Sequence, residues 1–213
     1  LVGGDQLQVT AELEPASRAL ITSVAAQKVY GTVRRSRRHP QGCWAQQQLR
    51  FHLAAGSDLE WLPQELVLYA DALYQQEMRV ELAAGASFLA MEVVRLGRTA
   101  AEEQLQNGCW RSSIEIQRLA TATSPSRWEL VDRLELAGDA LTAEHGMANE
   151  PVFGSLVWAA PQHLATETLQ LLLDQARAAR SDLVGSMACG PLEQGLVARY
   201  RGPSSQAARF WFC

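Results

Sequence analysis

Hydrophobic and polar residues alternate along much of the first 140 residues of the chain. Three stretches place apolar side chains at every second position, between Gln, Thr, Arg, Glu or His: residues 7–13, 49–53 and 78–82. A shorter stretch sets Glu115 between Ile114 and Ile116. Alternation with a period of two puts one face of a strand on a core and the other in water. The pattern therefore predicts that the chain begins as a series of half-buried β-strands.

Three of these strands end in a similar short unit. Each unit runs from a leucine through small residues into a second apolar strand, at residues 13–20, 53–60 and 82–89. Gly56 and Gly85 suit the positive φ that such turns need. A strand–turn–strand unit that recurs in this way predicts stacked β layers, each covering its neighbour. Ordinary β-hairpins in a β-sandwich are the alternative interpretation.

The last third of the chain has a different pattern. Leucines at helical spacing predict a helix over residues 161–180, with Pro161 at the first helical position, where a missing N–H is no loss. Residues 192–200 alternate again and predict a strand. Ser204 or Ser205 can cap a second helix. This helix is expected to be short, and to leave the aromatic residues 210–212 uncovered.

These elements together predict a mainly β fold. We expect stacked or superhelical, β-helix-like layers followed by two C-terminal α-helices, with a β-sandwich as the alternative. A single domain over residues 1–213 is expected, in which residues 1–140 form the β stack and residues 141–213 a mixed α/β part. No apolar run is long enough to span a membrane.

Composition narrows the class of protein. The chain has 213 residues, is 47% hydrophobic and carries a net charge of −4. This apolar fraction is too high for a disordered chain, and the length suffices for a core without disulfide or metal staples. Because phosphate binding needs a basic surface, a mildly acidic chain is not expected to be a general nucleic-acid binder.

Familiar catalytic motifs are absent from the sequence. It contains no phosphate-binding GxxxxGK[ST] loop, no GxGxxG after a strand and no GxSxG nucleophile turn. Its cysteines lie too far apart in sequence for a zinc or CxxC motif: Cys43, Cys109, Cys189 and Cys213. We expect reduced thiols and a cytoplasmic location, because no secretory signal is evident.

The densest charge in the chain is a basic run at residues 34–39. We interpret it as a solvated hairpin loop between strands at residues 25–30 and 43–53, since turn-forming residues follow it. The functional alternative is contact with an acidic partner or with nucleic acid, which would make the chain an arginine-loop RNA-binding adaptor.

Acidic residues gather near the repeated turns. Without His or Cys close by in sequence, surface carboxylates are the default interpretation for all of them: Asp58, Glu60, Glu65, Glu92, Glu102 and Glu103. The alternative is a carboxylate-dependent hydrolase that uses Asp58 and Glu60, which alternation places on one face of a strand. At the start of the chain, Gly3-Gly4-Asp5 predicts a turn before the first strand rather than an anion-binding loop.

Several motifs resemble those of one family, the urease accessory protein D family, called H in some bacteria. The most specific of them is the run Leu59-Glu60-Trp61-Leu62-Pro63-Gln64-Glu65. Other matching stretches occur in the family's order over residues 1–135: Gly3 to Leu7, Gln27-Lys28-Val29-Tyr30, Gln48 to Leu53, Arg79 to Leu82 and Leu96 to Ala100. The C-terminal third matches more loosely.

The resemblance implies a non-catalytic scaffold for urease maturation. Family members have a superhelical β stack with two helices, bind accessory proteins F and G and apo-urease, and assist the insertion of nickel. The resemblance therefore implies a cytoplasmic protein, and the composition adds the expectation of no membrane or nucleic-acid partner. It also implies an interior path or surface for metal transfer. We expect no tightly bound cofactor and at most transient nickel, since transfer needs a site that releases its ion.

The resemblance also supplies candidate residues. We take Asp58, Glu60 and Glu103 as candidates for lining a nickel path. The residues that carry the family motifs are Gly3, Gly4, Asp5, Lys28, Tyr30, Gln48, Glu60, Trp61, Leu62, Pro63, Gln64, Gly97, Arg98 and Glu103. Glu102 stands where the family usually has glycine, which puts the turn after Ala101 in question. By comparison with the family, the chain is expected to be truncated at both ends.

Overall fold

The computed structural model describes residues 1–213, which form 13 β-strands, three α-helices and one 3-10 turn. The strands are β1 (Gln6–Leu13), β2 (Arg18–Thr22), β3 (Gln27–Val29), β4 (Ala45–Leu53), β5 (Asp58–Leu62), β6 (Leu66–Leu68), β7 (Leu73–Leu82), β8 (Ser87–Leu96), β9 (Cys109–Arg118), β10 (Arg127–Leu136), β11 (Val152–Ala159), β12 (Ser186–Leu192) and β13 (Gly195–Gly202). The helices are α1 (Asp139–Thr142), α2 (Thr166–Ala178) and α3 (Ser205–Phe212), and η1 is the 3-10 turn at Thr99–Ala101.

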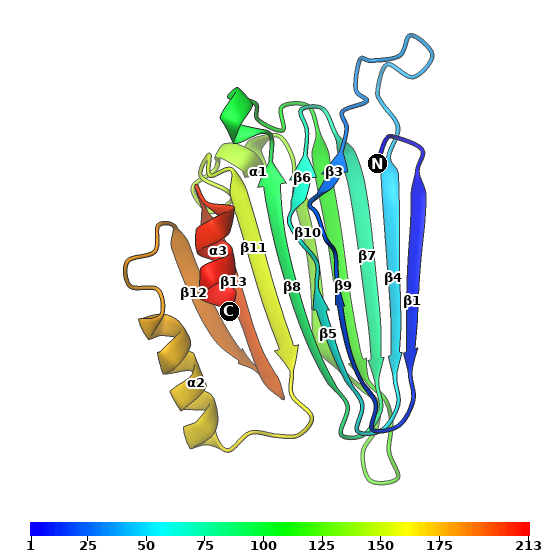
Figure 1. The fold of residues 1–213 in the computed structure, drawn as a ribbon, viewed down its shortest axis with the longest axis vertical. Helices are drawn as coiled ribbons and strands as arrows, with labels where there is room; N and C mark the ends of the chain where they lie inside the picture. Colours follow the sequence, from blue (N-terminus) through cyan, green and yellow to red (C-terminus); the bar gives the residue numbers. More distant parts are fainter.

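The strands form two mixed sheets that lie face to face (Figure 1). Sheet A has the order β1-β4-β7-β9-β10, and its first four strands run parallel. Sheet B has the order β12-β13-β11-β8-β5-β2, with β6 joining β3 to β8. The prediction of a mainly β chain is therefore confirmed. A superhelical course of the layers stays a prediction.

Each repeated turn carries the chain from sheet A into sheet B, from β1 to β2, β4 to β5 and β7 to β8. Each of the three turns contains one residue with a positive φ, which is +58° at Ala16, +68° at Gly56 and +71° at Gly85. Backbone bonds link consecutive turns, because the Ala16 N–H donates to the Ala55 carbonyl and the Gly56 N–H to the Ala84 carbonyl, both at 3.0 Å. The three units therefore lie beside one another along the sheets.

The main core fills the space between the two sheets. Phe51 on β4 and Phe88 on β8 face each other with ring centroids 5.9 Å apart, and both are fully buried. Alternate residues of β4 and β7 supply much of the rest: Leu49, Leu53, Met78, Val80 and Leu82. The period of two that predicted these strands thus reflects one face of sheet A packed on sheet B.

The helical part differs from the prediction in two places. The helix expected over residues 161–180 begins only at Thr166, so the placement of Pro161 at its first position is wrong. The chain is still held to the sheet at Ala160, whose N–H donates to the Gln194 carbonyl at 2.9 Å, and it then needs a short connection before α2 can start. The structure also has a third helix, the single turn α1, in addition to the two that were predicted.

Helix α3 covers the outer face of sheet B, where it contacts β8, β11 and β13 (Figure 1). The Ser204 hydroxyl accepts the Ala207 N–H at 3.1 Å, which confirms the predicted cap. Trp211 is buried, and its Nε1–H donates to the Ala176 carbonyl of α2 at 2.7 Å. The expectation that residues 210–212 are all uncovered is therefore wrong for Trp211, while Phe210 is 64% exposed.

The basic run forms a loop between β3 and β4, as predicted, but the loop is not a hairpin. Strand β3 pairs with β6 in sheet B, whereas β4 pairs with β1 and β7 in sheet A. Since β3 lies in sheet B and β4 lies in sheet A, the loop that joins them has to cross from one sheet to the other. The predicted strand at residues 192–200 is β13, and β12 precedes it.

Two further observations complete the description of the fold. All four cysteines are free thiols, and Cys109 is the buried one. None of the helices combines the length and the apolar character that crossing a membrane would require.

Candidate functional site

A line of polar side chains crosses the otherwise apolar interior between the sheets. The Gln47 Oε1 accepts from Gln27 Nε2 at 3.0 Å and from the Tyr74 hydroxyl at 2.5 Å. Next along the line, the Gln76 Nε2 donates to Glu92 Oε1 at 2.5 Å. We call these five residues the interior polar line; they come from β3, β4, β7 and β8.

Strand register explains why these side chains meet. Gln47 and Gln76 stand at inward positions of β4 and β7, in series with leucine, methionine and phenylalanine, and they are paired across the two strands. Gln47 is 6% exposed and Gln76 is 8% exposed. A buried polar side chain costs free energy unless it finds a partner, so neighbouring inward glutamines stabilise one another.

Glu92 is the ionisable member of the line. It lies on the inner face of β8 among Phe88, Ala90 and Val94, and the surface that it keeps accessible faces a cavity. Burial raises the pKa of Glu92 to about 7, while the hydrogen bond from Gln76 acts in the opposite direction. A carboxyl with a pKa near neutral can gain or lose a proton under physiological conditions.

The cavity beside Glu92 has a volume of about 210 Å³. Trp61, Pro63 and Gln64, from the most specific family motif, form part of its wall. Trp61 is held by Phe51, with ring centroids 5.3 Å apart. The rim includes the exposed Thr22, the last residue of β2, so the cavity opens on that side.

The polar contacts continue beyond Glu92 toward β10 and β13. Ser155, which lines the cavity, accepts from Arg199, and the Arg199 Nη2 contacts Asp132 Oδ2 at 2.5 Å. Arg199 also lines a second cavity of about 330 Å³, whose wall includes Met187 and Phe153. The contact between Ser155 and Arg199 therefore joins the wall of the first cavity to the wall of the second.

A different buried polar cluster joins the lower ends of the two sheets. Arg118 Nε donates to Glu129 Oε2 at 2.8 Å, and its other nitrogens donate to the Ala86 carbonyl at 3.2 Å and the Ala160 carbonyl at 2.5 Å. The Gln194 N–H donates to Glu129 Oε1 at 2.6 Å. We call this the Arg118–Glu129 cluster. Both carboxylate oxygens of Glu129 accept hydrogen bonds, so the cluster has the character of a structural crosslink rather than of a binding site.

The three candidate nickel-path residues lie in two separate places. Asp58 and Glu60 share the outer face of β5, where Asp58 accepts from the Ser87 hydroxyl, and neither residue lines the two cavities. Glu103 lies beyond the other end of β8, near Arg98. No group of three His, Cys, Asp or Glu side chains is placed to hold a metal ion. As points along a path, these residues stay a prediction.

Other family-motif residues meet at the top of sheet B. The rings of Tyr30 and Tyr69 contact edge to face at 4.8 Å, and the Arg98 guanidinium lies 4.5 Å from the centre of Tyr69. Glu103 accepts from Arg98 Nε at 2.8 Å and from the Ala70 N–H at 2.6 Å. The bond from Arg98 lowers the pKa of Glu103. Residues from two separate motifs, together with Tyr69, thus form one ordered cluster.

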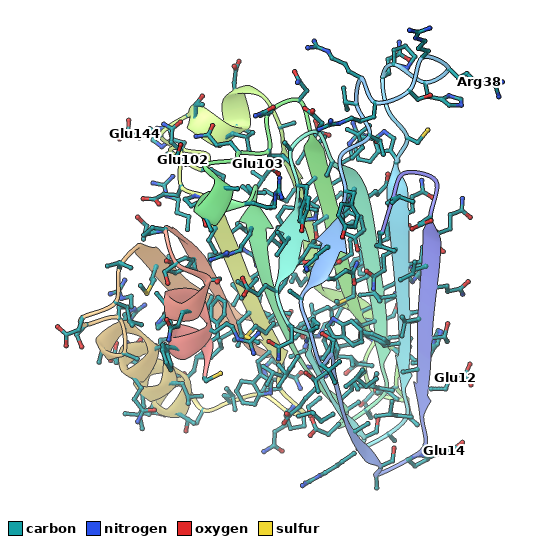
Figure 2. The ribbon with its side chains drawn as sticks, turned by 45° about the horizontal axis from the view of Figure 1, so that its top comes forward. Glu12, Glu14, Arg38, Glu102, Glu103 and Glu144 are labelled. Carbon is teal, nitrogen blue, oxygen red and sulfur yellow. The ribbon has the colours of Figure 1, made fainter.

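Backbone geometry explains two further positions of this cluster. Gly97 has a φ of +111°, and a Cβ there would lie 2.1 Å from the Glu103 carbonyl oxygen, so only glycine fits. Glu102, where a glycine was expected, adopts the left-handed conformation with φ +53°, and its N–H closes the turn on Thr99 at 3.0 Å. The turn therefore forms with glutamate, and Figure 2 shows Glu102 beside Glu103 at this end of the molecule.

The remaining motif residues have structural positions. The Gly3-Gly4-Asp5 segment is a turn, as predicted, in which Asp5 Oδ2 accepts the Val2 N–H at 2.8 Å. Lys28 and Gln48 are exposed, Lys28 on β3 and Gln48 on the outer face of sheet A. Leu62 packs against the core beneath α3.

Sequence reasoning missed the interior polar line, and it placed Glu92 among surface carboxylates, which is wrong. The missed signal is positional, because Gln47 and Gln76 interrupt an apolar alternation at inward positions. Glu92 stands within the apolar run 88–94, which also indicates an enclosed site. The sequence around the residues of the Arg118–Glu129 cluster shows no comparable interruption of an apolar pattern.

Comparison with known proteins places the chain among named relatives. A family model described as UreD urease accessory protein matches residues 1–213. The urease accessory protein UreD of Synechococcus sp. (strain CC9605) is 62% identical over 212 residues, which cover 100% of this chain and 68% of the relative. That of Synechococcus sp. (strain WH7805) is 61% identical over 213 residues, covering 100% and 67%. That of Prochlorococcus marinus (strain MIT 9303) is 60% identical over 212 residues, covering 100% and 70%.

Proposed function

The chain belongs to the UreD family of urease accessory proteins, and from that premise we propose that it is a scaffold for nickel insertion into apo-urease. A role in urease maturation without catalysis of its own follows from the family. The finer proposal is that the protein acts in a complex with accessory proteins F and G, in the cytoplasm. Within this complex, nickel is a cargo that the protein passes on.

The observation that carries the proposal is the interior polar line and the cavities beside it. Carboxylate and amide oxygens replace the water ligands of a divalent cation, and each such contact is weak enough to be exchanged. A sequence of single oxygen ligands suits passage, whereas storage needs several ligands converging on one point. Such a sequence lies along the wall of the first cavity: Gln47, Gln76, Glu92 and Ser155. Ser155 in turn contacts Arg199 on the wall of the second cavity.

The protonation state of Glu92 would control how strongly this part of the path binds a cation. A protonated carboxyl binds a cation poorly, and the ionised form binds it well. Because its pKa lies at about 7, Glu92 exchanges a proton for a cation at little cost near neutral pH. We propose that nickel passes Glu92 with release of its proton and leaves when the proton returns.

The test uses a urease-positive host whose own copy of this gene is deleted. The host is complemented with the wild-type gene, with Glu92→Ala or with Glu77→Ala, and urease activity and the nickel content of purified urease are measured. Glu77 is the matched control, since it is a carboxylate on the outer face of sheet A. We expect the wild-type gene and Glu77→Ala to restore both readouts, and Glu92→Ala to restore them several-fold less.

Co-purification separates assembly from nickel transfer in the same strains. Glu92→Ala is expected to retain accessory proteins F and G and apo-urease, because Glu92 is enclosed. Deletion without any loss of urease activity would refute the scaffold role. Full nickel loading with Glu92→Ala would refute the path through Glu92. The variants Asp58→Asn, Glu60→Gln and Glu103→Gln test the three sequence candidates in the same way.

A further inference from the structure

The loop between β3 and β4 has the highest density of positive charge in the molecule. Four arginines and a histidine occupy residues 34–39, and all five are exposed. The loop rises beyond the neighbouring turns at that end of the sheets (Figure 1). Figure 2 shows Arg38 at the tip, directed away from the rest of the protein. We call this segment the arginine loop.

The loop arginines differ from most other arginines of the chain in their pairing. Ten arginines elsewhere form ion pairs with Asp or Glu, for example Arg133 with Glu115 and Arg111 with Glu135. Arg34, Arg35, Arg37 and Arg38 form none. The four guanidinium groups therefore stand together without an ion pair to a carboxylate of their own chain.

The base of the loop is fixed. The Thr32 hydroxyl donates to the Cys43 carbonyl at 3.0 Å and accepts the Cys43 N–H at 3.1 Å, which ties the two sides together. Within the loop, the Arg34 N–H donates to the Pro40 carbonyl at 2.8 Å. A loop closed at its base and across its middle loses less conformational freedom on binding than an open one.

We propose that the arginine loop is the docking site for a short acidic segment of a partner protein. A planar guanidinium pairs with a carboxylate through two parallel hydrogen bonds, which an exposed and unpaired arginine can offer at once. Four such groups within five residues fit a segment with three or four carboxylates. The inference goes beyond the nickel scaffold and does not rest on it.

Charge around the loop favours a short acidic segment over a nucleic acid. The chain carries −4 in total, so the residues outside the four loop arginines carry −8. Glu102, Glu103 and Glu144 lie at the same end of the molecule as the loop (Figure 2), and the pKa of Glu103 is lowered by Arg98 and, to a smaller extent, by Arg35 of the loop. A long polyanion would extend past the loop and be repelled by these carboxylates, whereas a short acidic segment can bind within the loop alone.

The test measures binding of a fluorescent dodecaglutamate peptide to the full chain by anisotropy at low and high salt. The variant R34S/R35S/R37S/R38S is expected to bind the peptide on the order of tenfold to a hundredfold more weakly, since each exposed pair contributes roughly 1.5- to 5-fold. Wild-type binding is expected to weaken as salt rises. Unchanged binding by the serine variant would overturn the proposal.

The matched control removes the same charge elsewhere. The variant R50Q/R79Q/R111Q/R133Q changes four arginines on the outer face of sheet A that are already paired with glutamates. It is expected to keep most of the wild-type affinity. An equal loss in both variants would mean that net charge alone attracts the peptide, which would overturn a local docking site.

Two further variants separate geometry from charge. Lysine at all four loop positions keeps the charge but loses the planar fork, and its affinity is expected to be intermediate. Thr32→Val loosens the base without any change of charge, and weaker binding is expected. A single-stranded 20-nucleotide RNA is the competing ligand. Tighter binding of the RNA than of the peptide at the same salt would refute the protein partner in favour of a nucleic acid.

Discussion

Glu92 and Glu129 are carboxylates held between the same two sheets, but their surroundings differ. Both oxygens of Glu129 are bonded, Oε2 to Arg118 and Oε1 to the Gln194 N–H, and its side chain is fully buried. Glu92 accepts a hydrogen bond from Gln76 through Oε1, and its remaining surface faces a cavity. One carboxylate is paired with an arginine, whereas the other is held by a neutral amide.

This difference in partners makes Glu129 a structural group and Glu92 a candidate functional group. A buried carboxylate with a complete set of partners fixes the segments that supply them, here the end of β9 and the turn between β12 and β13. A carboxylate with one neutral partner and an adjoining cavity keeps the capacity to take a proton or a cation. The partners of a buried charge, rather than its burial alone, therefore indicate its role.

The largest effect is expected from Arg118→Met. This change leaves the Glu129 carboxylate without its main partner and removes the bonds to the Ala86 and Ala160 carbonyls. Loss of one partner of a buried ion pair costs about 4 kcal/mol. We expect the free energy of unfolding, measured by urea denaturation, to fall by about that amount.

The double variant Arg118→Met/Glu129→Leu sharpens the interpretation. Replacing both members of a buried pair by apolar residues removes the unpaired charge, so part of the lost stability is expected to return. If the double variant were less stable than Arg118→Met, burial of the charge would not be the cause of the loss. The Arg118–Glu129 cluster would then act through packing alone.

The next effect concerns Glu92 and pH. Since burial raises its pKa from 4.5 to about 7, the folded protein keeps a proton that the unfolded chain has lost between these values. This contribution to stability is complete below pH 4.5 and is lost as the pH rises through about 7. Its size is about 3 kcal/mol, because one pKa unit corresponds to about 1.4 kcal/mol.

Glu92→Gln removes this titration while keeping the size of the side chain. The variant is expected to match the wild type below pH 4.5 and to be more stable by about 2–3 kcal/mol near pH 8. Urea denaturation across this pH range provides the measurement. Parallel curves for the two proteins would show that Glu92 is not the titrating group, and the comparison with Glu129 would lose its basis.

Strand pattern and turn chemistry made much of sheet A and of the three repeated turns predictable. Alternation at residues 49–53 and 78–82 identified β4 and β7, because a buried face imposes a period of two on any half-covered sheet. Gly56 and Gly85 marked turns that need a positive φ. These features are local, so a single sequence displays them.

The candidate site was much less predictable, because it depends on contacts between distant segments. Glu92 and Asp58 look alike in sequence, yet Glu92 faces a cavity and Asp58 lies on an outer sheet face. Which face of β8 turns inward is decided by its pairing with β5 and β11. The predicted helix start at Pro161 was wrong for the same reason, because a backbone bond to the sheet at Ala160 places the start of the helix further along the chain.

A smaller effect is expected from Gln76→Leu. The variant removes the amide that donates to Glu92 and lowers its pKa, so the pKa of Glu92 is expected to rise by about one further unit. Carbon-13 NMR of the Glu92 carboxyl group against pH measures this shift. Gln48→Leu is the control, since Gln48 points outward from sheet A and leaves the line intact. A pKa that stays at its wild-type value would remove Gln76 from the set of groups that tune Glu92.

The smallest effect is expected from Arg133→Gln, which carries the comparison to the protein surface. Arg133 contacts Glu115 at 2.7 Å, nearly the 2.8 Å that separates Arg118 from Glu129, but its side chain is 70% exposed. Water and salt already screen this pair, so its loss is expected to cost at most about 0.5 kcal/mol, and less at high salt. Urea denaturation at two salt concentrations measures both effects. Because the two contacts are of nearly equal length, the ratio of their costs isolates the contribution of burial. A loss for Arg133→Gln as large as that for Arg118→Met would mean that contact geometry, rather than burial, determines what an ion pair contributes in this fold.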